Sequence, residues 1–263
     1  MRSFLLLLCG TLLGAGALLA AGATSPVRIA TGPAPSDSMT GGMGSANFGK
    51  SIRAYLMANP EVLVDAMAEL ERKQDSQREN VALKAIQENQ TELLSDPASP
   101  TTGNPNGDVT VVEFSDYQCP YCKKAHTAVK AALAADGKVK LVYKDLPILG
   151  EASKVAAVAA LASIKQGKHE AFHEALMTNT AKLDSDLIFK IAGSVGIDVA
   201  QLQKDMNDPK IKDTIDRNMA LAQELGVRGT PAFVIGKQFV PGAVDAKTLQ
   251  QMISDARKGV WPY

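Results

Sequence analysis

The sequence predicts an α/β domain with a helical insertion, preceded by an N-terminal α-helical extension. Two short runs of β-branched and apolar residues, at 109–114 and 138–144, lie on either side of a helical segment. Ala-rich and amphipathic segments then fill residues 151–225, and two more short strands and a helix follow. Ahead of these elements, apolar residues recur at helical spacing through residues 47–95.

The composition is that of an ordinary globular protein and excludes one class of partner. The 263 residues are 46% hydrophobic, and 28 basic side chains balance 28 acidic ones. A chain without net charge has no overall field that attracts nucleic acid or an anionic membrane surface. We therefore expect no nucleic-acid partner.

Residues 1–23 are typical of a secretory signal peptide. Arg2 precedes a long apolar stretch, and Ala21-Gly22-Ala23 offers small residues for cleavage. A permanent membrane anchor is the alternative, because the stretch approaches the roughly 20 residues that span a bilayer. A lipoprotein signal ending at Cys9 is less favoured, since its apolar core would be short. We predict export to the periplasm.

Cleavage there leaves two cysteines, Cys119 and Cys122, in the mature chain. In the oxidising compartments that exported proteins meet, a structural disulfide is the common use of a cysteine pair. A bridge across only two intervening residues closes a small loop, however, and adds little to the stability of a domain of this size. We therefore interpret the pair as chemically active.

Residues 24–46 are predicted to be a flexible linker, because they are rich in Thr, Ser, Pro, Gly and Met. The spacing then predicts helices over 47–95, with Asn59 as the N-cap where a helix restarts at Pro60. An amphipathic region of this length must bury its apolar stripe, either on the following domain or against copies of itself. We favour self-association, although the spacing is too irregular for a strict coiled coil.

The order of the later elements is that of a thioredoxin-like fold. Residues 96–108, rich in Pro, Gly, Asn and Ser, are expected to be a linker, and the domain spans 109–263. A helix from Cys119 joins the first two strands, and a hairpin turning at Gly236 supplies the last two. The helical block at about 151–225 is inserted between the two pairs.

The spacing of Cys119-Pro120-Tyr121-Cys122 suits redox chemistry. At a helix start, Cys119 lies among backbone N–H groups without helical partners, at the positive end of the helix dipole, and these groups stabilise its reactive thiolate. Cys122 lies one turn later and is less exposed, so it can attack a mixed disulfide and resolve it. Pro120 suits the first helical turn.

Two alternatives to this interpretation involve metal. The cysteines and His126 could belong to a zinc site, but no fourth ligand stands out. His169-Glu170-Ala171-Phe172-His173 fits the H-E-x-x-H pattern of metalloproteases, but no histidine follows it as a third ligand. We expect an ordinary amphipathic helix at this point, and no metal site.

Glu113 and the Thr230-Pro231 pair are further candidate site residues. Glu113 interrupts a strand suited to burial, where an unpaired carboxylate is costly and has a raised pKa. It could pass protons to and from Cys122 through water, unless it faces solvent at the strand end. Pro231 opens a strand, and the bond before it is where a cis peptide would be placed. This loop would offer the Thr230 backbone to an extended substrate.

These residues carry a resemblance to a known family. Over about 105–258 the chain resembles the disulfide bond protein A (DsbA) family of bacterial exported thioredoxin-fold proteins. The resemblance rests on Glu113-Phe114-Ser115-Asp116-Tyr117-Gln118-Cys119-Pro120-Tyr121-Cys122 and Gly229-Thr230-Pro231-Ala232. It implies that Cys119 is the nucleophile, Cys122 the resolving thiol, Glu113 the proton relay and Pro231 a cis-proline. We also expect Pro120, Tyr121, Thr230 and Pro231 to bind substrate, and no cofactor beyond a redox-active Cys119–Cys122 disulfide.

Departures from the family's archetypal oxidase bear on function. That enzyme has His where this chain has Tyr121, and without an imidazole near the thiolate we expect a weaker oxidant. It has Val where this chain has Thr230, a residue more familiar from exported isomerases. The helical extension resembles the copper-sensitivity suppressor C (ScsC) and Com1-like branch, whose members oligomerise through it. The resemblance implies a homo-oligomeric disulfide isomerase or reductase, with unfolded or misoxidised exported proteins as substrates and a membrane redox partner. The alternatives are a monomeric dithiol oxidase and a copper-binding thiol protein, the latter suggested by Met39 and Met43.

Overall fold

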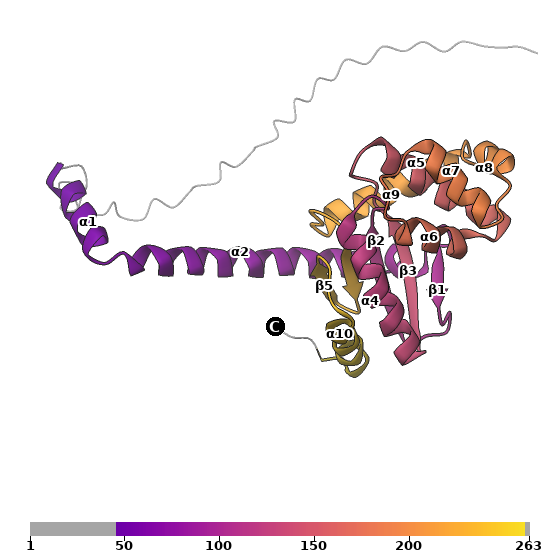
Figure 1. The fold of residues 1–263 in the computed structure, drawn as a ribbon. Helices are drawn as coiled ribbons and strands as arrows, with labels where there is room; N and C mark the ends of the chain where they lie inside the picture. Colours follow the sequence, from indigo (N-terminus) through magenta and orange to yellow (C-terminus); the bar gives the residue numbers. More distant parts are fainter. Residues whose placement is uncertain (1–45, 261–263) are drawn as a thin grey trace, which may run out of the picture. The chain divides into compact units, whose positions relative to one another are not determined.

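The computed structural model describes residues 46–260, and the chain divides into two compact units, 1–63 and 64–263. The predicted signal peptide and nearly all of the predicted linker at 24–46 lie outside the described residues. The second unit contains a five-stranded mixed sheet with the strand order β1-β3-β2-β4-β5 (Figure 1). The strands are β1 (Thr101–Gly103), β2 (Val109–Ser115), β3 (Val139–Asp145), β4 (Ala232–Ile235) and β5 (Gln238–Pro241).

Strand β2 lies at the centre of this sheet. It pairs in parallel with β3, from Val109 opposite Val139 to Ser115 opposite Asp145, and antiparallel with β4. Both β2 and β3 are almost fully buried, as their apolar runs predict. Strands β4 and β5 form the predicted hairpin, and its turn needs a glycine because Gly236 has a φ of 61°.

Helices cover both faces of the sheet. Helices α4 (Pro120–Asp136) and α10 (Ala246–Lys258) pack on the face that carries Val111. On the opposite face, α3 (Gln90–Ser95) and the end of the preceding helix pack with Val112. The helix that begins beside the two cysteines is therefore fixed along its length against the central strands.

Five α-helices and a short 3-10 helix form the predicted insertion between β3 and β4. Their buried residues are largely Ala, Leu and Ile, and the same hydrophobic cluster includes Cys119 and Cys122. The insertion therefore packs directly against the start of α4. The α-helices are α5 (Glu151–Ala162), α6 (His169–Thr178), α7 (Ser185–Ser194), α8 (Val199–Asp205) and α9 (Pro209–Glu224).

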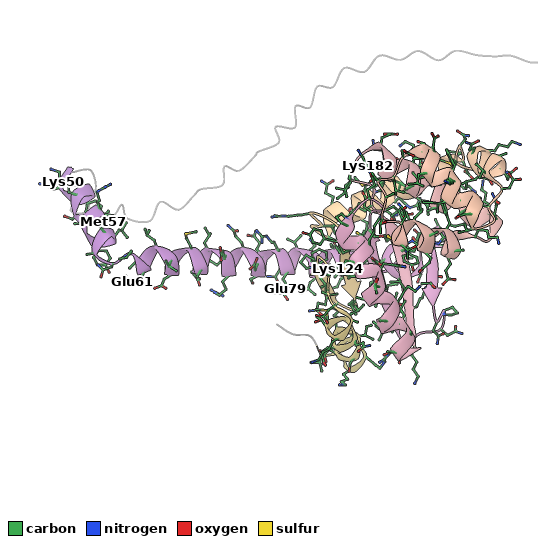
Figure 2. The ribbon with its side chains drawn as sticks, in the orientation of Figure 1. Lys50, Met57, Glu61, Glu79, Lys124 and Lys182 are labelled. Carbon is green, nitrogen blue, oxygen red and sulfur yellow. The ribbon has the colours of Figure 1, made fainter. Side chains whose placement is uncertain are left out.

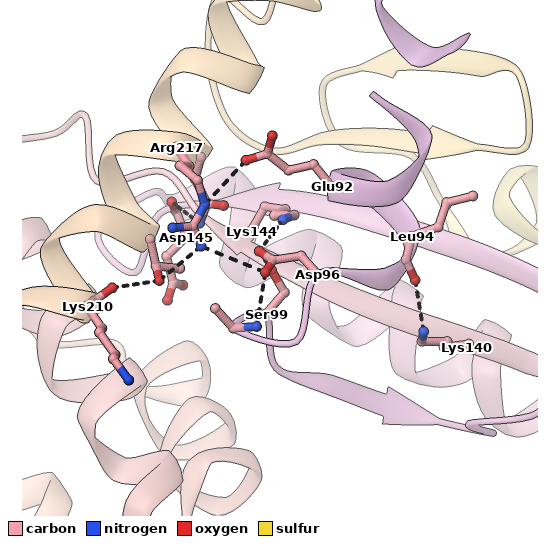
Figure 3. A network of polar contacts seen from close by, with 12 residues as sticks. Glu92, Leu94, Asp96, Ser99, Lys140, Lys144, Asp145, Lys210 and Arg217 are labelled. Carbon is pink, nitrogen blue, oxygen red and sulfur yellow. Dashed lines mark hydrogen bonds and ion pairs between the residues drawn. The ribbon is translucent and has the colours of Figure 1, made fainter. Parts of the chain in front are cut away.

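Residues 96–108 differ from the linker that the sequence predicts. Residues 101–103 form β1, which pairs antiparallel with β3. Ahead of β1, the carboxylate of Asp96 accepts a hydrogen bond from the Ser99 hydroxyl and lies 3.0 Å from the ammonium of Lys144, which is fully buried (Figure 3). Partners distant in the sequence thus order this segment, and local composition carries no sign of them.

Helix α1 (Ala46–Ala58) belongs to the first unit, and α2 (Glu61–Glu88) begins there and continues into the second. The prediction that Asn59 caps the start of the second helix is wrong. Its side-chain amide instead donates to the carbonyl of Tyr55 at 2.8 Å, so it satisfies the end of α1.

Side chains point outward all round α2 between Glu61 and Glu79 (Figure 2). Several of the large apolar side chains on α1 and on α2 are exposed, and exposed apolar surface of this kind marks an interaction site. They include Ile52, Tyr55, Met57, Leu63, Val64, Met67 and Leu70. Of the helices within residues 46–260, none is long and apolar enough to cross a membrane.

Candidate active site

The two cysteines lie where β2 leads into α4. Cys119 is the N-cap residue of α4, with extended backbone angles, and Pro120 occupies the first turn. Cys122 lies one turn inside the helix and is completely buried, whereas 4% of Cys119 is exposed. Both are free thiols. Burial raises the pKa of Cys122 well above its usual value, so this thiol needs a base before it can attack.

Thr230, in the loop before β4, contacts the cysteines. The Cys119 thiol donates a hydrogen bond to the carbonyl oxygen of Thr230, with 3.1 Å between the heavy atoms. The Thr230–Pro231 peptide bond is cis, as the family resemblance implies. Two chain segments separated by more than a hundred residues therefore meet at the sulfur atom.

A surface hollow of about 390 Å³ lies beside this contact. Tyr121, with 65% of its surface exposed, contributes to the wall together with Lys124. Thr230, Pro231 and the loop at Gly242 complete the lining. The hollow offers backbone groups and one aromatic ring next to Cys119, which suits an extended polypeptide. Of the predicted substrate-binding residues, Tyr121, Thr230 and Pro231 line it, and Pro120 does not.

Asp116 holds the loop around the cysteines, a role that sequence reasoning missed. Its buried carboxylate accepts hydrogen bonds from the backbone N–H groups of Gln118, Ile148 and Leu149 and from the hydroxyl of Ser153. Its backbone also contacts both cysteines, because its carbonyl accepts from the Cys119 N–H and its N–H donates to the Cys122 sulfur. An Asp directly after a buried strand is a signal for such a loop anchor.

Glu113 lies on the sheet face that α4 covers. Alternate residues of a strand share a face, so Glu113 lies on the side of Val111, which packs with α4. Its side chain is 1% exposed, and neither carboxylate oxygen has a hydrogen-bond partner. Burial, together with the nearby charge of Asp145, raises the pKa of Glu113 to about 8. The alternative of a solvent-facing glutamate is wrong.

Asp145 is a second buried carboxylate on this face that the sequence did not reveal. It lies opposite Ser115 in the register of β2 and β3, and burial raises its pKa to about 7. Burial, together with the charge of Asp145, raises the pKa of the nearby Tyr117 hydroxyl, although neither Asp145 oxygen reaches hydrogen-bond geometry. Two buried carboxylates with raised pKa values therefore lie on the sheet face that α4 covers.

The three histidines lie in helices of the second unit. His126 in α4 lies 2.7 Å from the carboxylate of Glu174, and His169 and His173 are buried in α6. Within residues 46–260, no group of three or more His, Cys, Asp or Glu side chains has the arrangement of a metal site. The H-E-x-x-H pattern lies in α6, whose buried side includes Phe172 as well as the two histidines.

Comparisons with known proteins find two matching families. The DSBA-like thioredoxin domain family matches residues 110–254, and the family of the copper resistance protein ScsC N-terminal domain matches residues 46–77. In structure, the chain is similar to a thioredoxin-like oxidoreductase of Silicibacter pomeroyi DSS-3. The two are 50% identical with a TM-score of 0.64, over 65% of this chain and 98% of that one.

The chain is also similar to Proteus mirabilis ScsC in a transitional conformation, at 31% identity and a TM-score of 0.63, over 82% of this chain and 100% of that one. It is 29% identical over 157 residues to the probable disulfide bond formation protein D of Bacillus cereus, covering 55% of this chain and 73% of the relative. A further relative is the Na(+)/H(+) antiporter NhaA 3 of Salinispora tropica, 27% identical over 150 residues. The match covers 56% of this chain, but only 23% of the antiporter's length.

Proposed function

The chain belongs to the DSBA-like family of thiol-disulfide oxidoreductases, and we propose that within it the protein is an oligomeric disulfide isomerase or reductase of exported proteins. The observation that carries the redox chemistry is the Cys119 thiol at the start of α4, hydrogen-bonded to the carbonyl of Thr230 beside a cis-proline. The sulfur lies beside backbone groups that an extended substrate can pair with.

The chemistry follows in two steps. The Cys119 thiolate attacks a substrate disulfide, which forms a mixed disulfide and releases one substrate thiolate. Cys122 then loses its proton and attacks the Cys119 sulfur, which forms the Cys119–Cys122 disulfide and releases the second substrate sulfur. Glu113 accepts the Cys122 proton in this scheme, since its raised pKa allows it to bind and release a proton near neutral pH.

The N-terminal extension supports isomerase activity over oxidase activity. Residues 46–77 match the ScsC N-terminal domain family, and the helices there carry exposed apolar side chains. Self-association through them would bring several active sites to one substrate, and a misoxidised protein needs several rounds of exchange before it reaches its native pairing. We also propose that the protein is exported, that it acts on exported substrate proteins and that it has a membrane redox partner. This part of the proposal rests on residues 1–23, which are typical of a signal peptide.

Reactivation of scrambled ribonuclease in a glutathione buffer tests the proposed activity. The mature protein should restore ribonuclease activity, and Cys119→Ser should abolish the effect because it removes the nucleophile. If the scrambled enzyme stays inactive while the oxidised protein forms disulfides in reduced ribonuclease, the protein is a dithiol oxidase. Inactivity in both assays would contradict the redox proposal.

A further inference from the structure

The three histidines of the sequence form one buried cluster between α4 and α6. The ring of His173 lies 5.4 Å from that of His126 and 5.7 Å from that of His169, measured between centroids. The Tyr143 ring of β3 packs on His173 at 4.1 Å. The cluster therefore lies beside the sheet face that carries the two buried carboxylates.

Polar contacts lead from this cluster to the protein surface. The Nδ1 atom of His173 lies 3.0 Å from the Tyr117 hydroxyl, and its other ring nitrogen is buried without a partner. The adjacent ring, His126, has its Nε2 atom 2.7 Å from Glu174. The Glu174 side chain is 39% exposed and also binds the ammonium of Lys130. A proton that reaches His126 is thus one contact from solvent.

The inner end of these contacts is Tyr117, near the carboxylates under α4. Tyr117 is fully buried, and burial, followed by the charges of Asp145 and Glu113, raises the pKa of its hydroxyl, although no oxygen of either carboxylate reaches hydrogen-bond geometry. Tyr117 follows directly after Asp116, whose backbone N–H donates to the Cys122 sulfur. One tyrosine therefore connects the vicinity of the resolving thiol to the histidines.

The reaction requires a proton path of this kind. When Cys122 attacks the mixed disulfide, its sulfur gains a bond to Cys119, the substrate sulfur leaves with the electron pair of the broken bond, and the Cys122 proton remains in the interior. The substrate thiolate takes its own proton from solvent. Glu113 can take the interior proton but is 1% exposed, so it must pass the proton on before the next turnover.

We propose that Tyr117, His173, His126 and Glu174 form a proton relay between the buried carboxylates and solvent, which serves the resolving step of the proposed oxidoreductase. Tyr117 and His173 can exchange a proton in either direction, because the hydroxyl and a neutral imidazole can each donate or accept. The rings of His173 and His126 are direct neighbours, 5.4 Å apart between centroids, so the two imidazoles are consecutive members of the relay. This assigns a role to the second histidine of the H-E-x-x-H pattern.

Single-turnover kinetics of the full chain test the relay, with a disulfide-bonded model peptide as substrate and acid-quenched mass spectrometry as readout. Tyr117→Phe keeps the ring and removes the relaying hydroxyl, and His173→Asn keeps an acceptor for Tyr117 but cannot pass a proton through the ring. We expect both changes to slow decay of the mixed disulfide by about tenfold or more and to leave its formation unchanged. D₂O should slow this decay further in the variants, where proton removal has become limiting.

His169→Gln is the matched control, because His169 is buried on the same face of α6 and contacts the rings of Tyr143 and His173 but makes no hydrogen bond to Tyr117 or Glu174. It should leave both steps unchanged. Wild-type decay rates in the folded Tyr117→Phe variant, or equal slowing by His169→Gln, would overturn the relay alone. If the wild-type protein forms no mixed disulfide at all, the oxidoreductase proposal fails and the relay fails with it.

Discussion

At the residue scale, the buried carboxylates give this domain groups for proton transfer that the balanced charge of the chain does not reveal. Glu113 lies in the central strand without a hydrogen-bond partner, and burial favours its neutral form. A site that must take up and release a proton near neutral pH benefits from this, but the folded state is destabilised whenever the carboxylate ionises. Ionisation of Glu113 therefore serves proton transfer but lowers the stability of the folded state.

Glu113→Gln should stabilise the protein, and more so at pH 8 than at pH 5. The folded-state pKa of Glu113 is raised from 4.5 to about 8, so over this range the folded state binds more protons than the unfolded state and stability falls as pH rises. Gln resembles the protonated acid and removes this pH dependence. At about 1.4 kcal/mol per pKa unit, the contribution of Glu113 to the change in unfolding free energy over this range is on the order of 4 kcal/mol. Urea denaturation of the reduced proteins at both pH values measures the difference. Equal pH dependence in the two proteins would show that Glu113 is ionised when folded. Asp145 is left to titrate in both and accounts for the dependence that remains.

At the element scale, the segment between the helical extension and β2 is part of the folded domain. Asp96 pairs with Lys144, whose side chain is completely buried at the end of β3. Desolvation lowers the pKa of Lys144, and the hydrogen bond and charge of Asp96 oppose that shift. This buried ion pair helps to hold the segment before β1 against β3, the strand with which β1 pairs.

Asp96→Ala should lower the free energy of unfolding by about 3 kcal/mol or more, because it leaves the Lys144 ammonium buried without a counter-charge. Arg217→Ala is the control. Arg217 contacts Asp96 and Glu92 at 3.7 and 3.6 Å, but its side chain is 45% exposed, so its loss should cost less than about 1 kcal/mol. Denaturation at neutral pH measures both. Equal costs would mean that the buried pair contributes no more than a surface contact.

Sequence patterns predicted the elements whose signals are local. The apolar runs of β2 and β3 and the cysteine pair at the start of α4 can be recognised within a few residues, and Glu113 is conspicuous as a charge within an apolar run. Strand β1 was missed because its three residues are mostly exposed and only pairing with β3 defines them. The burial of Asp145 and the contact between Tyr117 and His173 were missed because they depend on tertiary packing between residues far apart in the sequence.

At the scale of the whole molecule, the exposed stripe on α2 is the feature that the domain leaves unexplained. Leu63, Met67 and Leu70 recur at intervals of four and three residues, so they lie on one side of the helix, and each is at least half exposed. Exposed apolar surface of this kind has a free-energy cost in water that a partner helix would remove. A second copy supplies the same stripe, as symmetric self-association requires.

Met67→Glu should therefore reduce the assembly to monomers, whereas Ser76→Glu should not, because Ser76 lies on the opposite side of α2 and is already exposed. Sedimentation equilibrium measures the mass of each protein, and the wild-type mass should be a multiple of the monomer's. Because both variants leave Cys119 and its surroundings untouched, the rate of attack on a small disulfide should stay at the wild-type value in each.

Reactivation of scrambled ribonuclease should fall only in Met67→Glu, if several active sites must act on one substrate. A wild-type monomer would contradict the assembly. Full reactivation by monomeric Met67→Glu would instead separate isomerase activity from self-association, and would place the determinants of isomerase activity in the hollow lined by Tyr121 and Thr230.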